Sequence, residues 1–96
     1  MRALSHSALP RASQLDEPIL HVLKTSPDTL DNDAIDQAVA RQLGVPEQAL
    51  RALHTPGHGT RTEFAYRMAW ARTRLRLKGL IERVGSRSWR AVRQSL

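Results

Sequence analysis

Among the residue types of this 96-residue sequence, arginine has the clearest potential to bind a partner. Residues 1–48 contain four Lys/Arg and seven Asp/Glu, a net charge of −3, whereas residues 49–96 contain eleven Lys/Arg and two Asp/Glu, a net charge of +9. Ten of these eleven basic residues are arginines, and a planar guanidinium suits phosphate and guanine better than a lysine ammonium does. The uneven charge therefore indicates a polyanionic partner for the second half, with an ordinary solvated basic surface as the alternative.

The other reactive side chains form no recognisable site. His54 and His58 lie four residues apart, but Pro56 and Gly57 between them prevent a helix from presenting both to one metal ion, and the sequence has no Cys. The acidic residues between positions 28 and 36 lack the glycine and glutamate spacing of a calcium-binding loop. No strand–turn–helix pattern carries a nucleophilic serine. The sequence therefore predicts a protein that is not an enzyme and that holds no metal or cofactor.

The composition also limits where the chain can act. No apolar run approaches the roughly 20 residues that a membrane-spanning helix needs, and the lack of Cys fits a reducing compartment. We therefore expect a cytoplasmic protein without a membrane partner. Residues 15–93 are expected to form one domain, preceded by a flexible N-terminal arm (residues 1–14) that lacks the apolar block of a secretory signal and followed by a C-terminal tail (residues 94–96).

Many of the basic residues fall on a predicted helix from Arg61 to Lys78, a stretch without Gly or Pro. Thr60 and Glu63 have the spacing of a capping box at its start, and Gly79 is typical of the residue that ends a helix. On a helical wheel its apolar residues form two stripes, and a helix buried on two sides is the central element of a small fold. The stripes consist of Phe64, Met68, Ala71 and Leu75, and of Tyr66, Trp70, Thr73 and Leu77.

Two basic ridges separate these apolar stripes. They consist of Arg67, Arg74 and Lys78, and of Arg72 and Arg76 together with the small Ala65 and Ala69. The second ridge is a face that can approach a groove closely. For Arg67, an ion pair with an acid of the second predicted helix is the alternative to a contact with a partner.

The residues after Gly79 predict a β-hairpin. Its strands are Leu80–Val84 and Ser88–Val92, and Gly85-Ser86-Arg87 joins them. Trp89 alternates with Arg90, so its indole should point into the core while the guanidinium points out. We expect both this tryptophan and Trp70 to be core residues rather than platforms for nucleic-acid bases.

The residues before the long helix predict three shorter helices and a short strand. The first helix runs from Asp16 to about Thr25, and residues 29–30 are expected to form a short strand or a bridge that pairs with the hairpin. The second helix follows caps at residues 31–33 and ends at Gly44, and the third runs from Pro46 to about Leu53. Residues 54–59, with two glycines and a proline, should form an irregular loop. This order predicts a mainly α protein with a small β-hairpin, a winged helix-turn-helix.

The same residues resemble a known family. The chain is similar to the N-terminal winged-helix domain of Mrr-type restriction endonucleases through the pattern Phe64-x-x-Arg67-x-x-Trp70-Ala71-Arg72-x-x-Leu75-x-x-x-Gly79-Leu80-Ile81-Glu82, followed by Trp89-Arg90. The resemblance covers roughly residues 15–92. It implies a DNA-binding module that, in the full enzymes, directs a separate nuclease to modified DNA.

Two departures from the family pattern concern the hairpin and the nuclease. The family usually has a Gly just before the hairpin tryptophan and a Thr soon after it, where this chain has Arg87 or Ser88, and Val92. The PD-(D/E)xK nuclease signature is absent, because Pro27-Asp28 has no acid-x-Lys partner downstream. The resemblance therefore implies binding without cleavage by that chemistry.

We expect a non-catalytic module of a restriction system that binds double-stranded DNA and acts with a nuclease domain or a partner protein. The expected contacts are Thr60, Arg61, Thr62, Arg67, Arg72, Arg76, Arg83, Arg87 and Arg90. This interpretation requires the guanidinium groups to gather on one exposed surface, free of the acidic first half. The alternatives are a winged helix that binds protein or forms a homodimer, and a small transcriptional regulator.

Overall fold

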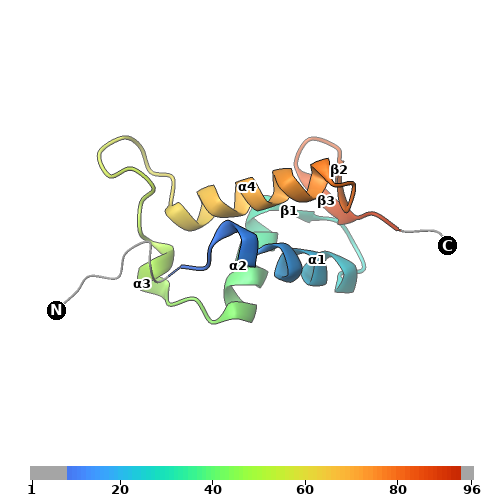
Figure 1. Cartoon of the computed structure of the whole chain (residues 1–96), viewed down its shortest axis with the longest axis horizontal. Coiled ribbons are helices and arrows are strands. Elements are labelled where there is room, and N and C mark those ends of the chain that lie inside the picture. The colour runs from blue at the N-terminus through green and yellow to red at the C-terminus, as the bar shows by residue number, and fades with distance from the viewer. Residues whose placement is uncertain (1–8, 94–96) are drawn as a thin grey trace.

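The long basic helix, α4 (Glu63–Leu77), runs along one edge of the molecule, and the remaining elements lie to one side of it (Figure 1). The computed structural model describes residues 9–93. In chain order the other elements are a 3-10 helix (Ala12–Gln14), α1 (Asp16–Thr25), β1 (Leu30–Asp31), α2 (Asn32–Leu43), α3 (Glu47–Leu50), β2 (Ile81–Val84) and β3 (Ser88–Ala91).

The helix boundaries follow the local capping chemistry closely. The carboxylate of Asp31 accepts a hydrogen bond from the Ala34 N–H at 2.8 Å and so begins α2. Gly44, at a φ of 64°, ends α2 in the left-handed conformation that glycine adopts without strain. The predicted spans of α1 and α2 are confirmed, and the predicted strand before α2 is present one residue later, at Leu30–Asp31.

The start of α4 is two residues later than the sequence predicted. Thr62 is the N-cap, and its hydroxyl accepts a hydrogen bond from the Ala65 N–H at 3.1 Å. The expected capping box between Thr60 and Glu63 is therefore wrong. The Glu63 carboxylate binds His54 and Arg67 instead, and its own N–H donates to the Ala52 carbonyl at 2.8 Å.

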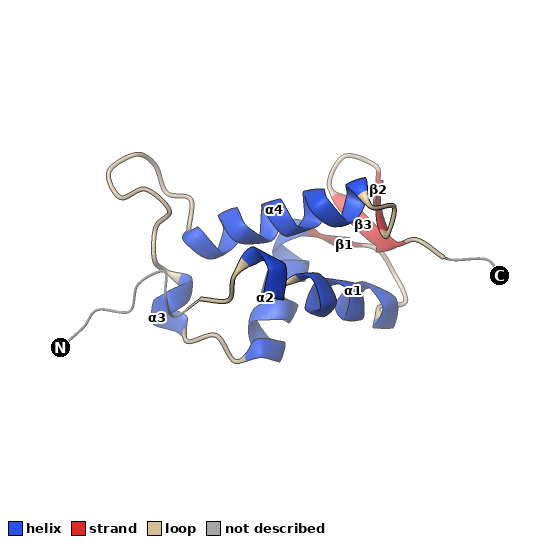
Figure 2. Cartoon of the chain, viewed as in Figure 1, coloured by secondary structure: helices blue, strands red, loops and turns tan. Residues whose placement is uncertain are grey.

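The three strands form one antiparallel sheet in the order β1-β3-β2, so the N-terminal strand pairs with the last strand of the chain (Figure 2). Leu30 lies opposite Trp89 in β3, and Arg83 in β2 lies opposite the same tryptophan. The strands of the hairpin match the predicted ones to within one residue at one end of each. A small sheet of this order beside helices is a winged helix, as the sequence predicted.

The hydrophobic core occupies the space between α4, the other helices and the sheet. Its largest fully buried side chains are Leu15, Ile19, Ile35, Val39, Met68, Leu75 and Ile81. The first predicted stripe of α4 is confirmed, because its four members, from Phe64 to Leu75, are all buried. Trp89 is also buried, and its indole N–H donates to the Asn32 side-chain oxygen at 2.7 Å.

The second predicted stripe of α4 is wrong. Trp70 is 55% exposed and Leu77 is 76% exposed, although both were expected in the core. The reason is that the core lies on the Met68 side of α4, so no described helix or strand covers Trp70 or Leu77 on the opposite side. The core of the described chain is therefore one-sided with respect to α4.

The segment before α1 packs on the domain from residue 9 onward. Leu9 is 6% exposed, and the backbone carbonyls of Leu9 and Pro10 accept hydrogen bonds from Arg67 at 3.2 and 3.0 Å. The expectation of a flexible arm is therefore wrong for residues 9–14. The rest of that arm (residues 1–8) and the predicted tail (residues 94–96) lie outside the described residues.

The different burial of the two tryptophans predicts different effects on stability. Trp89→Ala should lower the free energy of unfolding by about 3–5 kcal/mol, because it leaves a cavity in the core. Trp70→Ala should change it by only about 0.5 kcal/mol. Urea unfolding followed by far-ultraviolet circular dichroism measures both values, and a large loss for Trp70→Ala would contradict the one-sided core.

Candidate nucleic-acid interface

Two arginines of α4 point into the molecule and bind acids of the first half. The guanidinium of Arg72, which is 6% exposed, lies 2.5 Å from the Asp36 carboxylate of α2. Arg74 lies 2.6 Å from the Asp16 carboxylate of α1 and also donates to the Ala12 carbonyl at 2.9 Å. Part of the charge asymmetry of the sequence is therefore neutralised within the molecule.

The expectation that Arg72 and Arg76 share an exposed face is wrong for Arg72. The turn of the helix places Arg72 against α2, where Asp36 offers a buried counter-charge, while Arg76 is exposed. Arg72 is therefore a structural residue in this fold and cannot reach a partner without breaking a buried ion pair.

Arg67 is also held inside the domain, by a different acid from the one considered. Its Nε donates to the Glu63 carboxylate at 2.6 Å, one helical turn away, and its terminal nitrogen binds the carbonyls of residues 9 and 10. The ion pair with an acid of the second helix is made by Arg72, not by Arg67. This arginine joins the N-terminal segment to α4.

The buried pair with Arg72 changes the acidity of Asp36. Burial of the carboxyl group raises the pKa of Asp36 from 3.8 to about 6, because the loss of hydration outweighs the attraction of Arg72 and the hydrogen bond from it. The carboxyl group is therefore mostly ionised at neutral pH, as the ion pair with Arg72 requires, but it takes up a proton at a higher pH than an ordinary aspartate does.

The residues predicted at the start of α4 occupy a loop and a cap. Thr60 and Arg61 are exposed on the loop before the helix, and the Arg61 guanidinium lies 5.7 Å from the centre of the Tyr66 ring. Thr62 uses its hydroxyl as the N-cap. Of these three residues, Thr60 and Arg61 have exposed side chains that can meet a partner.

The hairpin arginines do not all face the same way. Successive residues of a strand point to opposite faces, so Arg83 lies on the face of Trp89, with its guanidinium 5.1 Å from the centre of the indole, and Arg90 lies on the other face opposite Glu82. Arg87 is exposed in the turn between the strands. The prediction of one surface for all three arginines is therefore wrong for Arg90.

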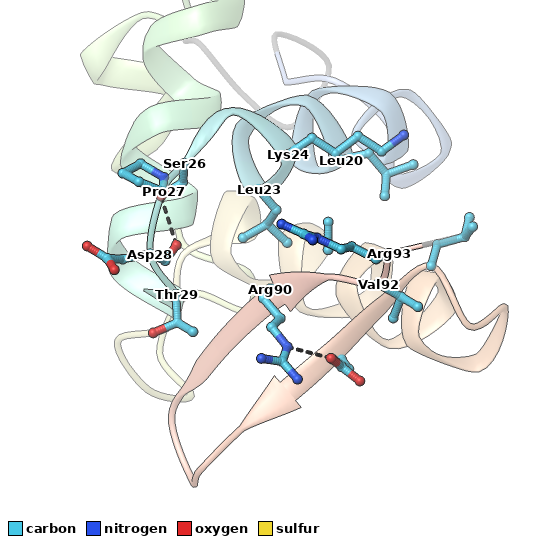
Figure 3. A pocket seen from close by; sticks show the side chains of 13 residues that line it. Leu20, Leu23, Lys24, Ser26, Pro27, Asp28, Thr29, Arg90, Val92 and Arg93 are labelled. Atoms are coloured by element: carbon cyan, nitrogen blue, oxygen red, sulfur yellow. Dashed lines mark hydrogen bonds and ion pairs between the residues drawn. The ribbon is translucent and has the colours of Figure 1, made fainter. Parts of the chain in front are cut away.

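Arg90 instead lines a cleft of about 790 Å³ between α1, the turn after α1 and the hairpin (Figure 3). Its guanidinium binds the Glu82 carboxylate, and Lys24 and Arg93 lie at the same cleft (Figure 3). Leu20, Leu23 and Val92 contribute apolar lining. Within residues 9–93, no group of three or more His, Cys, Asp or Glu side chains could hold a metal ion.

The part of α4 that faces away from the core is here called the outer face. It consists of Tyr66, Ala69, Trp70, Thr73, Arg76 and Leu77, which recur three or four residues apart. Sequence reasoning missed this face because Tyr66, Trp70 and Leu77 are apolar enough to be taken for core. The signal that separates it from the buried stripe is Thr73 at its centre.

Between residues 60 and 91, five basic residues are exposed and take part in no ion pair with a described residue. They are Arg61, Arg76, Lys78, Arg83 and Arg87. Arg76 lies on the outer face, Arg61 precedes α4, and the other three lie at its C-terminal end or in the hairpin that follows it. These five cations therefore lie on α4 or near its two ends, whereas Arg11, Lys24, Arg41 and Arg93 are exposed elsewhere in the described chain.

Comparison with known protein families tests the resemblance to the Mrr N-terminal domain that the sequence pattern indicated. The model of the Mrr N-terminal domain family matches residues 13–93. The chain belongs to the Mrr N-terminal domain family. A search of curated proteins and a search of solved structures each gave no match. This Mrr N-terminal domain has no helix within residues 9–93 that is long and apolar enough to cross a membrane.

The raised pKa of Asp36 predicts how the stability of this Mrr N-terminal domain depends on pH. The folded state holds the Asp36 proton more tightly than the unfolded state, so this contribution to stability is complete below a pH of about 4 and is lost as the pH rises through about 6. The unfolding free energy of the wild type minus that of Asp36→Asn should therefore be larger at pH 4 than at pH 7.5. Two pKa units set its change at about 3 kcal/mol at most.

Two measurements check this dependence. Urea unfolding of both proteins between pH 4 and pH 7.5 gives the free-energy difference, and ¹³C NMR of the Asp36 carboxyl carbon gives the midpoint, expected at about 6. A difference that grows as the pH rises would contradict the assigned burial of the carboxyl group.

Proposed function

We propose that this Mrr N-terminal domain binds double-stranded DNA without cutting it, with the outer face of α4 in the major groove and the hairpin on the adjacent backbone. The observation that carries the proposal is the position of Arg76, Arg83 and Arg87 on one helix and the hairpin that follows it. All three are exposed, and none forms an ion pair with a described residue. Membership of a family named for the N-terminal domain of Mrr supports the same function.

The shape of α4 fits this role. An α-helix with its side chains is about 10–12 Å across, which is close to the width of the major groove of about 12 Å. Ala69 and Thr73 are small, so on their side of Trp70 the helix backbone can approach the base edges. Trp70 and Leu77 offer apolar contact there, and Arg76 offers hydrogen bonds to a base edge or a phosphate.

The contacts in the proposal are fewer than the sequence suggested. Arg67 and Arg72 hold the fold together, and Arg90 faces the cleft beside α1, so none of the three is included. The remaining cations would engage about three to five phosphates. The logarithm of the affinity should then fall with the logarithm of the salt concentration at a slope of about −2.7 to −4.5.

A module of this kind supplies binding and not chemistry. The sequence offers no carboxylate pair with a nearby lysine of the nuclease type, so a separate nuclease domain or partner protein would have to supply cleavage. We propose that the domain positions such a partner on DNA.

A second function is favoured by one observation, the exposure of Trp70 and Leu77. Apolar side chains of this size on one helix face are also typical of a surface that binds protein. In that case α4 would pair with another protein or with a second copy of the chain, and association would depend weakly on salt.

Substitution of exposed arginines tests the DNA-binding function. Arg76→Ala and Arg87→Ala should each weaken binding to duplex DNA, and Arg87→Ala should also make the salt slope shallower by about 0.9, because it removes one phosphate contact. Arg41→Ala, which removes an exposed arginine from α2, is the matched control and should change neither quantity. Fluorescence anisotropy of a labelled duplex at four salt concentrations measures all three variants.

The same samples separate the two functions. Light scattering at low and high salt reports the oligomeric state of the wild type and of Trp70→Ala. A dimer that persists in high salt, is lost on Trp70→Ala and binds duplex weakly at every salt concentration would establish the protein-binding function in place of the proposed one.

A further inference from the structure

The loop between α3 and α4 is built like a hairpin at its base. Leu53 and Thr62 form an antiparallel bridge, and the His54 N–H donates to the Arg61 carbonyl at 2.9 Å. A turn closes within the loop, where the His58 N–H donates to the Thr55 carbonyl at 3.0 Å. The sequence predicted an irregular segment for residues 54–59, whereas the structure shows a segment with a paired base.

The base of this loop is fixed to α4 by an aromatic and ionic cluster. The His54 ring stacks on the Tyr66 ring with their centres 3.7 Å apart, and its Nδ1 lies 2.6 Å from the Glu63 carboxylate. Arg61 contacts the same tyrosine through its guanidinium. Because Tyr66 and Glu63 belong to the first turn of α4, these contacts set the direction of the loop relative to the helix.

The loop and the β2–β3 turn extend past α4 at its two ends and on the same side of the molecule (Figure 1). With 15 residues, α4 is about 22 Å long, so the two projections are separated by roughly that distance. A duplex that lay against α4 would therefore pass between a projection at each end of the helix.

We propose that residues 55–61 form a second arm that contacts the sugar-phosphate backbone of the duplex, opposite the β2–β3 hairpin. This inference rests on the proposed function, because it extends the same surface. The arm presents the exposed side chains of His58, Thr60 and Arg61. Gly57 and Gly59, at φ values of 86° and 125°, carry no Cβ at the tip, so a phosphate can approach their backbone N–H groups closely.

The geometry of the groove explains why two arms are useful. Phosphates line both sides of the major groove, and contacts to them fix the position of a recognition helix without reading the sequence. One arm at each end of α4 would hold the helix from both sides. Each arm also carries an exposed cation that can meet a phosphate. Arg61 lies on the loop before α4, and Arg87 lies in the hairpin turn.

Because the sequence contains no Cys, single-cysteine variants can each carry one iron–EDTA group that cleaves nearby DNA. Thr60→Cys places this group on the loop, Ser86→Cys places it on the hairpin, and Gln42→Cys places it at an exposed control position on α2. The first two should cut the backbone of a short duplex in two separate clusters, at least about five base pairs apart at 3.4 Å per base pair. The control should give no specific cut.

The outcomes separate the arm from the function on which it rests. Cuts from position 86 without cuts from position 60, in a variant that binds as tightly as the wild type, would overturn the arm and leave the DNA-binding function in place. If the wild type itself shows no salt-dependent binding to duplex DNA, both the arm and the DNA-binding function are overturned.

A charge series on the arm gives an independent readout. Arg61→Ala should make the salt slope shallower by about 0.9, and Arg61→Lys should restore it, because the lysine keeps the phosphate contact. Arg51→Ala is the matched control, since Arg51 is exposed near the base of the loop and pairs with Glu47. Circular dichroism confirms that α4 remains intact, and a slope unchanged in Arg61→Ala would count against the arm.

Discussion

The fold of this domain depends on ion pairs that tie one basic helix to the acidic first half of the chain. Arg72 and Arg74 reach from α4 to Asp36 of α2 and Asp16 of α1, so one helix is held against two others by charge as well as by apolar contact. A buried ion pair adds little net stability, because desolvation of both charges offsets their attraction, but removal of one partner is costly. Turning another side of α4 toward the core would leave Asp36 buried without its cation, so the pair with Arg72 disfavours other orientations of the helix.

This fixed orientation determines what is left for a partner. Once the Met68 side of α4 is turned inward, Trp70 and Leu77 are left outside, and the domain is too small to cover them. A large exposed indole is a cost to an isolated domain unless something else covers it in use. The exposure of the outer face is thus a consequence of the same contacts that stabilise the core, and it is what the proposed function uses.

The sequence predicted the elements well because their signals are local. Asp31 caps α2, Gly44 ends it, and alternation places Trp89 inside the sheet, so the winged-helix order followed from neighbouring residues alone. The candidate site was predicted less well because partners far apart in the chain decide it. Whether Arg72 is exposed depends on Asp36, and whether Trp70 is buried depends on which elements pack on α4. Neither fact can be read from a helical wheel, which shows that two faces exist but not which one the fold uses.

Because of the internal ion pairs, different residues of the proposed interface would contact the phosphates and the base edges. Since α4 uses three of its arginines within the domain, its outer face keeps one, Arg76, beside mostly apolar and small side chains. Electrostatic attraction to a polyanion must then come mainly from the segments at the ends of α4, through Arg61, Arg83 and Arg87. On the proposed function, those segments would supply the salt-sensitive affinity that is independent of sequence, while the outer face would supply contacts to base edges. A helix that contributes its charge to the core can still be the element that reads a duplex, provided that its neighbours along the chain hold the backbone.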